Sequence, residues 1–469
     1  MNTKALRQKI LDLAIHGKLV PQDPNDEPAS VLLERIRAEK ERLIKEGKIK
    51  KGKKSAKTSD KPHYPFELPK GWEWTTLGEI SNYGINTSVK VEEIDDNNWV
   101  LELEDIEKDS AKLIQKLSKN KREIKGTRHK FYKGNVLYSK LRTYLNKVLI
   151  ASEDGYCTTE IMPFDTYGIL SNEYICHVLR SSYFLDYTLQ CGYGVKMPRL
   201  STTDACNGVI PLPPLHEQYR IVKEIKRWFT LISMIEKEKD NLRETIKQAK
   251  AKVLDLAIHG KLVPQNPNDK PAVELLKRIN PKAEIISDNG HYQKLPVGWC
   301  LTKVKDAFII NPKNKENDDI EAGFVPMANI SDGFSNHFSF ETKKWETIKS
   351  GFTHFSDGDI AVAKISPCLE NRKSMVLSNL PNGIGAGTTE LHVFRPLCVT
   401  QLYGLYFFKS NYFINKCIGT FNGVVGQQRV GKNIVECIDF PLPPLAEQQR
   451  IVVKIEEIFQ QLDMIETAL

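Results

Sequence analysis

The longest regular pattern of apolar positions in the chain lies at its centre. Residues 215–259 contain neither glycine nor proline, and apolar or small residues recur there in alternating steps of four and three. The positions are Ile221, Ile225, Trp228, Ile232, Ile235, Leu242, Ile246, Ala249, Val253 and Leu256, and Lys239 interrupts the series once. This heptad spacing predicts one long helix with a narrow apolar stripe that requires a partner helix. At the α-helical rise, such a helix is roughly 60 Å long.

Internal repeats predict the partner helix. The segment LDLAIHGKLVPQ occupies residues 11–22 and recurs unchanged at residues 254–265, an offset of 243. The segment PLPPL occupies residues 211–215 and recurs at residues 441–445, an offset of 230. By these offsets the two ends of the chain correspond to all of the central helix except residues 240–243. We therefore expect a second, antiparallel helix assembled from both termini, which gives a circular organisation with an approximate two-fold axis.

Two globular segments are expected between these helical regions. The first begins with LPKGWEW and the second with LPVGW, and each ends at a PLPP motif. Their interiors differ except at three pairs of related segments: residues 134–147 and 358–373, the triplet TTE at residues 158–160 and 388–390, and an aromatic helical segment at residues 171–191 and 401–419. Short β-rich runs with one amphipathic helix predict an α/β (α+β) fold class. We expect two mixed α/β domains, separated by two long antiparallel coiled-coil helices and related by a pseudo-two-fold internal repeat.

The first helical region carries clear stop signals. After Ile15, Gly17 is placed for a left-handed helix cap and Pro21 prevents continuation. A second helix is expected over residues 26–45, with one apolar face made by Ala29, Leu32, Leu33 and Ile36. The duplicated helix end exposes four candidates for contact with a partner protein: His16, Lys18, His259 and Lys261. A capped helix end with no further role is the alternative interpretation.

Charge is unevenly distributed in the first half of the chain. Residues 92–109 carry nine carboxylates, whereas residues 112–147 carry twelve lysines and arginines against Glu123 alone. Residues 45–61 hold eight lysines, which predicts a disordered linker and also permits contact with DNA phosphates. The whole chain has a formal charge of +8. This basic excess permits a nucleic-acid partner without requiring one.

The basic stretch and its counterpart supply candidate DNA contacts. Arginine, lysine and asparagine read base edges in the major groove, and lysine and tyrosine also suit phosphates. The candidates are Lys121, Arg122, Arg128, His129, Lys130, Lys140, Arg142, Tyr144, Asn146 and Lys147 in the first domain, and Lys364, Arg372, Lys373, Gln427, Gln428, Arg429 and Lys432 in the second. A solvated basic face is the alternative interpretation.

Composition excludes several classes of protein. Nine cysteines without a CxxC pair argue against a disulfide framework and against a zinc ribbon, and they favour a reducing compartment. The chain has neither a signal-peptide core nor an apolar run long enough to cross a bilayer. We therefore expect a cytoplasmic protein without a membrane partner.

Catalytic motifs are not found. Residues 426–432 have the GxxxxGK spacing of a phosphate-binding loop, but Asn433 replaces the required Ser or Thr, and the following β-branched sequence is not expected to open a helix. The triplet at residues 341–343 matches half of a nuclease ExK motif, a match that arises by chance in a chain with 27% charged residues. No metal-ligand set is evident. We expect no catalysis, metal or cofactor in this chain itself.

Taken together, the motifs resemble one family. The doubled PLPPLxEQxRIV, the doubled AIHGKLVPQ, the LPxGW openings, and the GDIxxAKIxPCxEN and SKLRxYLNK segments are similar to those of the specificity (S) subunit of type I restriction-modification enzymes. The resemblance covers essentially the whole chain. It implies two target-recognition domains that each read one half of a bipartite, asymmetric sequence in double-stranded DNA.

The resemblance also implies the partners and the division of the chain. Two modification (methyltransferase) subunits would carry S-adenosylmethionine, and restriction subunits would supply ATP-driven and Mg-dependent translocation and cleavage. The implied regions are an N-terminal conserved helical region with basic linker (1–61), target-recognition domain 1 (62–214), a central conserved helical spacer (215–290), target-recognition domain 2 (291–444) and a C-terminal conserved helix (445–469).

Other functions remain open from the sequence alone. A stand-alone bipartite DNA-binding protein, such as a regulator, would use the same two domains without partner subunits. A coiled-coil scaffold that binds only proteins would show no steep salt dependence of DNA affinity. An isolated nuclease would cleave DNA in the presence of metal, which we expect to be absent.

Overall fold

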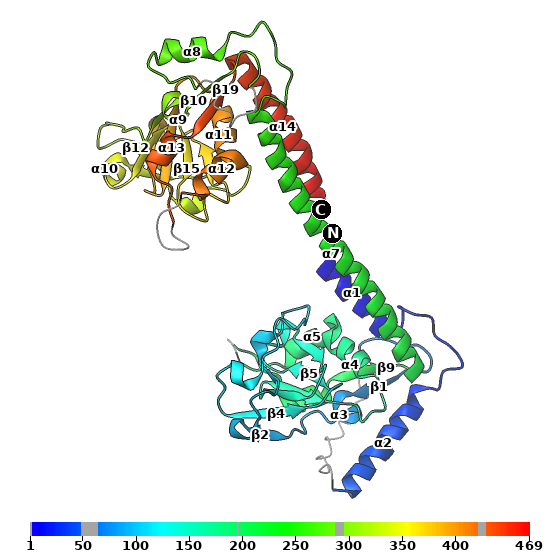
Figure 1. The fold of residues 1–469 in the computed structure, drawn as a ribbon. Coiled ribbons are helices and arrows are strands. Elements are labelled where there is room, and N and C mark those ends of the chain that lie inside the picture. Colours follow the sequence, from blue (N-terminus) through cyan, green and yellow to red (C-terminus); the bar gives the residue numbers. More distant parts are fainter. Residues whose placement is uncertain (1, 48–63, 195–196, 287–294, 421–427) are drawn as a thin grey trace. The chain divides into compact units, whose positions relative to one another are not determined.

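The computed structural model describes residues 2–47, 64–194, 197–286, 295–420 and 428–469. It consists of two compact units, residues 1–238 (unit 1) and residues 239–469 (unit 2). Each unit combines short strands with helices (Figure 1), which confirms the expected mixed α/β fold class.

Helix α7 is continuous over Leu215–Ile258, 44 residues, as the heptad spacing predicts. In unit 1, α1 (Thr3–Ile15) lies antiparallel to the first part of α7. The guanidinium of Arg7 is 2.9 Å from a carboxylate oxygen of Glu236, whereas Gln22, beyond the end of α1, donates to Glu217 at 3.2 Å. Contacts at both ends of α1 thus confirm the predicted antiparallel pairing within unit 1.

Unit 2 repeats the arrangement with the other terminal helix. Helix α14 (Leu445–Ala468) lies antiparallel to the second part of α7. Lys250 is 3.7 Å from Glu466, and Gln265 donates to Glu447 at 3.1 Å. Because position 7 corresponds to position 250 in the internal repeat, an arginine and a lysine perform the same pairing in the two units.

The apolar stripe of α7 is broader and less regular than the heptad spacing predicts. Ile221, Ile225, Ile232 and Ile246 are buried, but Trp228, Ile235 and Leu242 expose 39%, 40% and 38% of their surface. Positions beside the predicted seam are buried instead, among them Val222, Leu254, Ala257 and Ile258. The reason is that α7 packs against a globular domain as well as a terminal helix, and such a helix needs an apolar face wider than a coiled-coil seam.

The described residues of unit 1 form three small sheets. Strand orders are β1-β9, β2-β4-β7-β3 and β6-β5-β8. The elements are α2 (Ala29–Lys45), β1 (Glu73–Thr76), α3 (Leu77–Ile80), β2 (Ser88–Lys90), β3 (Val100–Leu101), β4 (Thr127–Phe131), β5 (Val136–Ser139), β6 (Val148–Ile150), β7 (Gly155–Thr158), β8 (Ile161–Phe164), α4 (Asn172–Arg180), α5 (Ser182–Cys191), α6 (Thr202–Asn207) and β9 (Val209–Leu212).

Where the structure describes unit 2, it too has three sheets, with strand orders β10-β19, β13-β12-β17-β14 and β11-β18-β15-β16. Its elements are α8 (Ala272–Ile279), β10 (Cys300–Lys303), α9 (Val304–Ala307), β11 (Phe308–Ile310), β12 (Glu321–Val325), β13 (Glu341–Lys344), α10 (Trp345–Ile348), β14 (Thr353–Ser356), β15 (Ile360–Ala363), β16 (Ser374–Val376), β17 (Ile384–Gly387), β18 (Leu391–Pro396), α11 (Gln401–Lys409), α12 (Asn411–Ile418), α13 (Lys432–Glu436) and β19 (Asp439–Leu442).

The two units share a common strand topology. In unit 1, β7 pairs parallel with β3 and antiparallel with β4; in unit 2, β17 pairs parallel with β12 and antiparallel with β14. The additional fourth strand differs, because β2 pairs with β4 whereas β13 pairs with β12. These two additions therefore lie at opposite edges of the shared three-stranded core.

A two-stranded antiparallel sheet joins the beginning and the end of each globular domain. Strand β1, after LPKGW, pairs antiparallel with β9, which leads into PLPP, and β10 pairs with β19 in the same way. The PLPP motif then leads directly into the first turn of α7 in unit 1 and of α14 in unit 2. The strand at each opening motif is therefore paired with the strand that leads into the closing motif of the same unit.

Most helices agree with the sequence expectations, although α2 begins at Ala29 and not at residue 26. The predicted apolar face of the second helix, Ala29, Leu32, Leu33 and Ile36, is buried along α2. Each aromatic segment, expected as one helix, forms two: α4 and α5 in unit 1, and α11 and α12 in unit 2. Ser181 and Ser410 separate them, because each serine leaves the helical conformation and caps the following helix with its side-chain oxygen.

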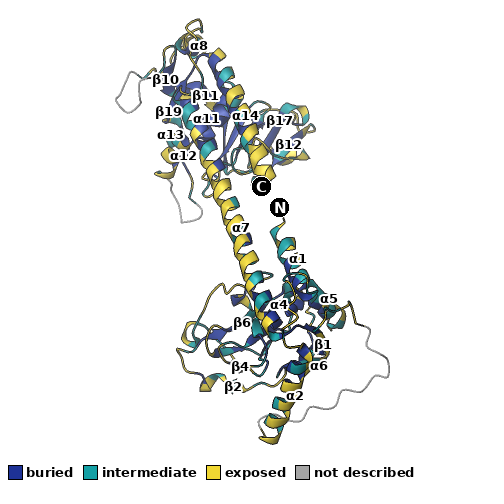
Figure 2. Cartoon of the chain, turned by 90° about the vertical axis from the view of Figure 1, so that its right-hand side faces the viewer, coloured by how far each residue is buried: buried dark blue, intermediate teal, exposed yellow. Residues whose placement is uncertain are grey.

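Burial is concentrated where the sheets meet α4 or α11 and the helical spacer (Figure 2). Tyr174 in unit 1 and Tyr403 in unit 2 are buried at corresponding positions, and their hydroxyls donate to the carbonyls of Pro211 and Pro441 at 2.8 and 2.9 Å. Each tyrosine therefore links its helix, α4 or α11, to the strand that leads into PLPP, β9 or β19.

Glycine is required where the duplicated helix ends. Gly260 has φ +64°, and a Cβ atom there would lie 2.2 Å from Cγ of Pro296. We expect Gly260→Ala to lower the free energy of unfolding of unit 2 by about 1–3 kcal/mol, measured by urea unfolding of the full chain, because alanine is strained in this conformation. Gly419→Ala is the control, since Gly419 has φ −68° and open space around it. Equal stability of the two variants would contradict the steric argument.

Candidate nucleic-acid interface

Five of the candidate DNA contacts in unit 1 keep exposed or half-exposed side chains. Lys121 ends a 3-10 turn (Lys119–Lys121), and the ammonium of Lys130 lies 5.1 Å from the ring centroid of Tyr132. Lys140 and Arg142 follow strand β5, and Tyr144 exposes 46% of its surface in the next turn. These side chains are available to a ligand.

Two arginines of the basic stretch are instead paired with the acidic stretch. Arg122 lies 2.6 Å from the buried carboxylate of Asp105, and Arg128 lies 2.8 Å from Glu102. The side chains of both arginines are largely buried, with 8% and 11% exposed. The charge separation seen along the sequence is therefore partly neutralised in the fold.

Three further candidates hold the domain together. His129 is buried, its ring contacts the carbonyl oxygen of Ile161 at 3.1 Å, and burial lowers its pKa. The side chain of Asn146 donates to the carbonyl of Arg180 at 3.2 Å, and Lys147 donates to the carbonyl of Leu103 at 2.7 Å. Burial also lowers the pKa of Lys147.

Two candidates in unit 2 are likewise engaged. Arg372 donates to the carbonyl of Lys409 at 3.0 Å, and its guanidinium carbon lies 4.8 Å from the ring centroid of Phe334. Lys373 donates to the carbonyl of Ile330 at 2.8 Å. Lys364, in contrast, follows β15 as Lys140 follows β5, and it is half-exposed.

The glycine-rich segment of unit 2 differs from expectation in one respect. Gln427 lies outside the described residues, and the backbone carbonyl of Gln428 accepts from Ser366 at 2.8 Å. The expectation that no helix follows was wrong, because α13 begins at Lys432 and runs for five residues. The side chain of Lys432 pairs with Glu436 at 3.2 Å.

A Lys–Glu–Arg arrangement recurs in both units. In unit 1, Arg199 donates to both carboxylate oxygens of Glu160 at 3.1 and 2.6 Å, and the backbone N–H of Lys140 donates to the Glu160 carbonyl at 3.0 Å. We call this trio the unit 1 triad. Glu160 and Arg199 were not among the candidates from the sequence.

The unit 2 triad consists of Lys364, Glu390 and Arg429. Arg429 donates to both carboxylate oxygens of Glu390 at 2.7 and 3.0 Å, and the backbone N–H of Lys364 donates to the Glu390 carbonyl at 2.9 Å. The recurring TTE triplet, whose glutamate is Glu160 or Glu390, was the sequence signal for both triads.

A cationic side chain ends α4 and α11 at corresponding positions, half-buried in unit 1 and fully buried in unit 2. Arg180 donates to the carbonyls of Asp109 and Ser110 at 2.9 and 2.8 Å. Lys409, fully buried, donates to the carbonyls of Gly333 and Arg372, both at 2.8 Å. Each cation ties neighbouring loops of the domain to the end of its helix.

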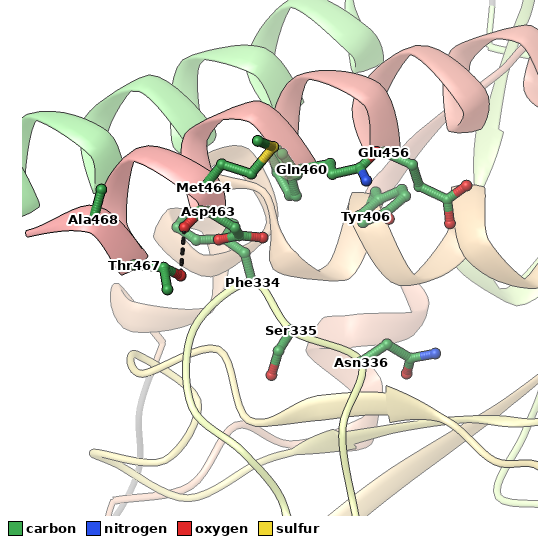
Figure 3. Close-up of a pocket in the computed structure, with 11 residues that line it drawn as sticks. Phe334, Ser335, Asn336, Tyr406, Glu456, Gln460, Asp463, Met464, Thr467 and Ala468 are labelled. Carbon is green, nitrogen blue, oxygen red and sulfur yellow. Dashed lines mark hydrogen bonds between the residues drawn. The ribbon is translucent and has the colours of Figure 1, made fainter.

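A hollow of about 660 Å³ borders the Gly333 loop in unit 2. Figure 3 shows Phe334, Ser335 and Asn336 facing Tyr406 and the last turns of α14. The carboxylates of Glu456 and Asp463 line it, together with the hydroxyl groups of Ser335 and Thr467. We assign no chemistry to this hollow.

The duplicated helix ends present their lysines to solvent. Lys18 and Lys261 are exposed, whereas His16 and His259 are half-buried and contact the carbonyls of Asp12 and Asp255 at 2.6 and 2.7 Å. The histidines therefore belong to the helix caps, and the lysines form the outer surface.

The part of the chain that the structure describes contains no group of three or more His, Cys, Asp or Glu side chains suited to hold a metal ion. It also contains no helix with the length and hydropathy needed to cross a bilayer.

The family model described as "Type I restriction modification DNA specificity domain" matches the chain twice, at residues 69–244 and 296–469. The chain belongs to this family. The first match contains the globular domain of unit 1 and α7 as far as residue 244, and the second contains the globular domain of unit 2 and α14. The two copies of the specificity domain thus correspond to the two repeats recognised in the sequence.

Two curated relatives come from Escherichia coli. The chain is 43% identical over 239 residues to "Type I restriction enzyme EcoAI specificity subunit" and 40% identical over 239 residues to "Type I restriction enzyme EcoEI specificity subunit". Each match covers 47% of this chain, and 41% and 40% of the respective relative. The matched region thus spans less than half the length of each of these relatives.

A solved structure shares the fold. It is described as "Structural basis underlying complex assembly and conformational transition of the type I R-M system". The TM-score is 0.57 at 18% sequence identity, and the match covers 86% of this chain and 94% of that one.

Lys409 makes a pH-dependent contribution to stability. Burial, reinforced by the nearby Arg372 charge and only partly offset by Asp332, lowers the pKa of Lys409 to about 7. Between this pKa and the ordinary value of 10.5 the unfolded chain binds a proton that the folded chain does not, so stability rises with pH. We expect Lys409→Met to remove a slope of up to about 1.4 kcal/mol per pH unit between pH 7 and 9, measured by urea unfolding.

Arg180→Met is the control for the Lys409 prediction, because it removes the corresponding half-buried cation of unit 1. Arginine stays protonated in proteins, so this variant should leave the pH slope unchanged over the same range. An equal slope in wild type and Lys409→Met would show that Lys409 remains charged when folded.

Proposed function

We propose that this chain is the DNA sequence-specificity subunit of a type I restriction-modification enzyme. It recognises a bipartite, asymmetric target in double-stranded DNA, with one half-site read by each globular domain. The observation that carries the proposal is the repetition of one strand topology, joined in the same way to a following helix, α7 or α14, with different intervening loops. A shared frame with different loops suits two readers of different sequences.

The proposed partners follow from this role. The chain docks two modification (methyltransferase) subunits and works with restriction (translocase and nuclease) subunits, in the cytoplasm. It catalyses nothing by itself, and S-adenosylmethionine, ATP and Mg are held by the partner subunits. Family membership and the names of the relatives support the role of specificity subunit in a type I enzyme.

The division of the chain follows the same proposal. We assign residues 62–214 and 291–444 to target-recognition domains 1 and 2, and residues 215–290 to the central conserved helical spacer. Residues 1–61 form the N-terminal helical region with its linker, and residues 445–469 form the C-terminal helix.

We propose that the candidate residues contribute to the DNA-contacting surface in two ways, by direct contact and by shaping loops. The exposed or half-exposed cations, such as Lys121, Lys130, Lys140 and Lys364, are suited to direct contact. Arg122, Arg128 and Arg372 act mainly by shaping the loops that carry the contacts, since their guanidinium groups are engaged within the fold.

The duplicated helix ends are the proposed docking surfaces for the modification subunits. Lys18 and Lys261 supply the contacts, and His16 and His259 hold the helix caps beneath them. Because the same sequence occurs in both units, two copies of one partner would find equivalent surfaces.

Replacing residues 62–210 by the first domain of another specificity subunit tests the division into two readers. We expect one half of the recognised sequence to change and the other half to remain, since mismatched base pairs cost about 1–3 kcal/mol each only where the exchanged domain reads them. Mapping of methylated sites across a genome measures both halves at once. A simultaneous change in both halves would refute independent reading.

Charge reversal tests the docking surfaces. We expect Lys18→Glu and Lys261→Glu each to reduce the modification subunits bound per chain from two to one, and the double variant to bind none, measured by native mass spectrometry after co-expression. The control is Lys108→Glu with Lys305→Glu, because both lysines are exposed and lie outside the helix ends. If wild type binds a bipartite DNA target but no modification subunit, the stand-alone DNA-binding protein is the better assignment.

A further inference from the structure

The internal repeat separates residues that both domains share from residues that differ. A half-site reader must differ from its counterpart wherever it discriminates between bases, because the two half-sites differ. A side-chain arrangement present in both domains therefore serves something that both half-sites, or both folds, have in common. The unit 1 and unit 2 triads are such an arrangement.

The correspondence of the triads extends to their positions in the fold. Each lysine directly follows a central strand, β5 or β15, and each glutamate lies in the turn between two strands, β7 and β8 or β17 and β18. Each arginine forms a β-bridge with the residue after the lysine: Arg199 with Leu141, and Arg429 with Ile365. The offset of 230 relates both the glutamates and the arginines.

Maintenance of the fold does not require the charged side chains. In unit 1 the backbone N–H of Leu200 donates to the carbonyl of Lys140 at 2.9 Å, and in unit 2 Val430 donates to Lys364 at 3.0 Å. With the lysine-to-glutamate backbone bonds, these bonds already join the strand end, the turn and the loop. An exposed ion pair adds only about 0–1 kcal/mol to such a connection.

The triads present cationic groups at the surface. The arginine side chains expose 47% and 44% of their surface, whereas the glutamates that hold them expose 21% and 24%. Hydrogen bonds from Arg429 lower the pKa of Glu390, so this carboxylate stays ionised and keeps the arginine in place. A guanidinium held in this way loses less conformational freedom when it binds a second anion.

The net charge of each triad is positive, since one lysine and one arginine accompany one glutamate. Neither lysine forms an ion pair within the part of the chain that the structure describes, and both are half-exposed. Lys140 and Lys364 also immediately precede the loops that carry Arg142 and Arg372. A common ligand with regularly spaced negative charge, next to candidate base-reading loops, is the DNA sugar-phosphate backbone.

We propose that each triad is a sequence-independent phosphate clamp, in which the lysine and arginine contact the DNA backbone and the glutamate positions the arginine. This inference rests on the proposed DNA-reading function and adds the residues that set the register of each domain on the duplex. Phosphate contacts fix position and orientation, whereas base contacts supply specificity. The two domains thus keep the first set and vary the second.

The salt dependence of DNA affinity tests the clamp. Affinities of the full-length chain are measured between 50 and 200 mM salt, on the recognised duplex and on a scrambled duplex of the same length. We expect Arg199→Gln and Arg429→Gln each to reduce the slope of log K against log[salt] by about 0.9, and the double variant by about 1.8, because each removes one phosphate contact. The affinity ratio between the two duplexes should remain unchanged.

Matched variants separate the clamp from a general loss of charge. Lys226→Gln with Lys349→Gln removes one exposed, ion-paired cation from each unit and should leave the slope unchanged. Arg199→Lys with Arg429→Lys keeps the charge and should keep the slope, with affinity reduced a few-fold through loss of the bidentate pairing. Circular dichroism and thermal melting confirm that each variant is folded.

Specific results would overturn the proposal. An unchanged slope in the folded double glutamine variant excludes phosphate contact, and loss of modification subunits in that variant instead assigns the triads to partner binding. A slope that falls only in one single variant excludes the duplicated role. Wild type that binds both duplexes equally refutes the proposed sequence-reading function while the slope still tests the clamp, and wild type that binds neither duplex overturns both.

Discussion

A buried carboxylate in the first turn of α7 and of α14 determines which segments of the chain must pack around that turn. Glu217 and Glu447 each expose only 1% of their surface, and burial raises the pKa of both. A charged group in such a position is tolerated only when hydrogen-bond donors surround it. Gln22 and Trp72 donate to Glu217 at 3.2 and 3.0 Å, and Gln265 donates to Glu447 at 3.1 Å.

This requirement explains why three motifs occur as a set. The glutamine belongs to HGKLVPQ, Trp72 belongs to LPKGW, and the glutamate follows PLPPL. Beside them, Arg220 pairs with Asp26 at 2.5 Å and Arg450 pairs with Asp269 at 2.6 Å. The helix end, the domain opening and the spacer helix must lie in contact, because together they supply the hydrogen-bond donors that the buried carboxylate needs. A substitution in one motif therefore alters the packing of the other two.

Features with local causes were predictable from the sequence. The length of α7, the cap at Gly17 with φ +64°, and the buried face of α2 all follow from periodicity and from turn chemistry within a few residues. The interruption at Ser181 was missed because the flanking aromatic residues continue a helical pattern, while the serine caps a new helix. Strand partners were not predictable, since β3 pairs with β7 across more than fifty residues.

In the candidate interface, contacts between distant segments were likewise not predictable from the sequence. The basic character of residues 112–147 was evident, but the engagement of Arg122 by Asp105 was not, because the pair forms only when the loops fold together. Glu160 carried a signal, the repeated TTE, without any indication of its partner. Arg199 lies in a segment unlike that of Arg429, and only their shared contact with the triplet glutamate reveals the correspondence.

The fourth strand of each mixed sheet has an evolutionary consequence. A strand added at an edge uses backbone groups that were unpaired before, so it forms without breaking any existing hydrogen bond. Strand β2 lies beside β4, and β13 lies beside β12, on the other side of the common core. The two copies therefore differ at opposite edges of the same core, and domains of this kind can diversify at either edge while the pairing of the three shared strands stays the same.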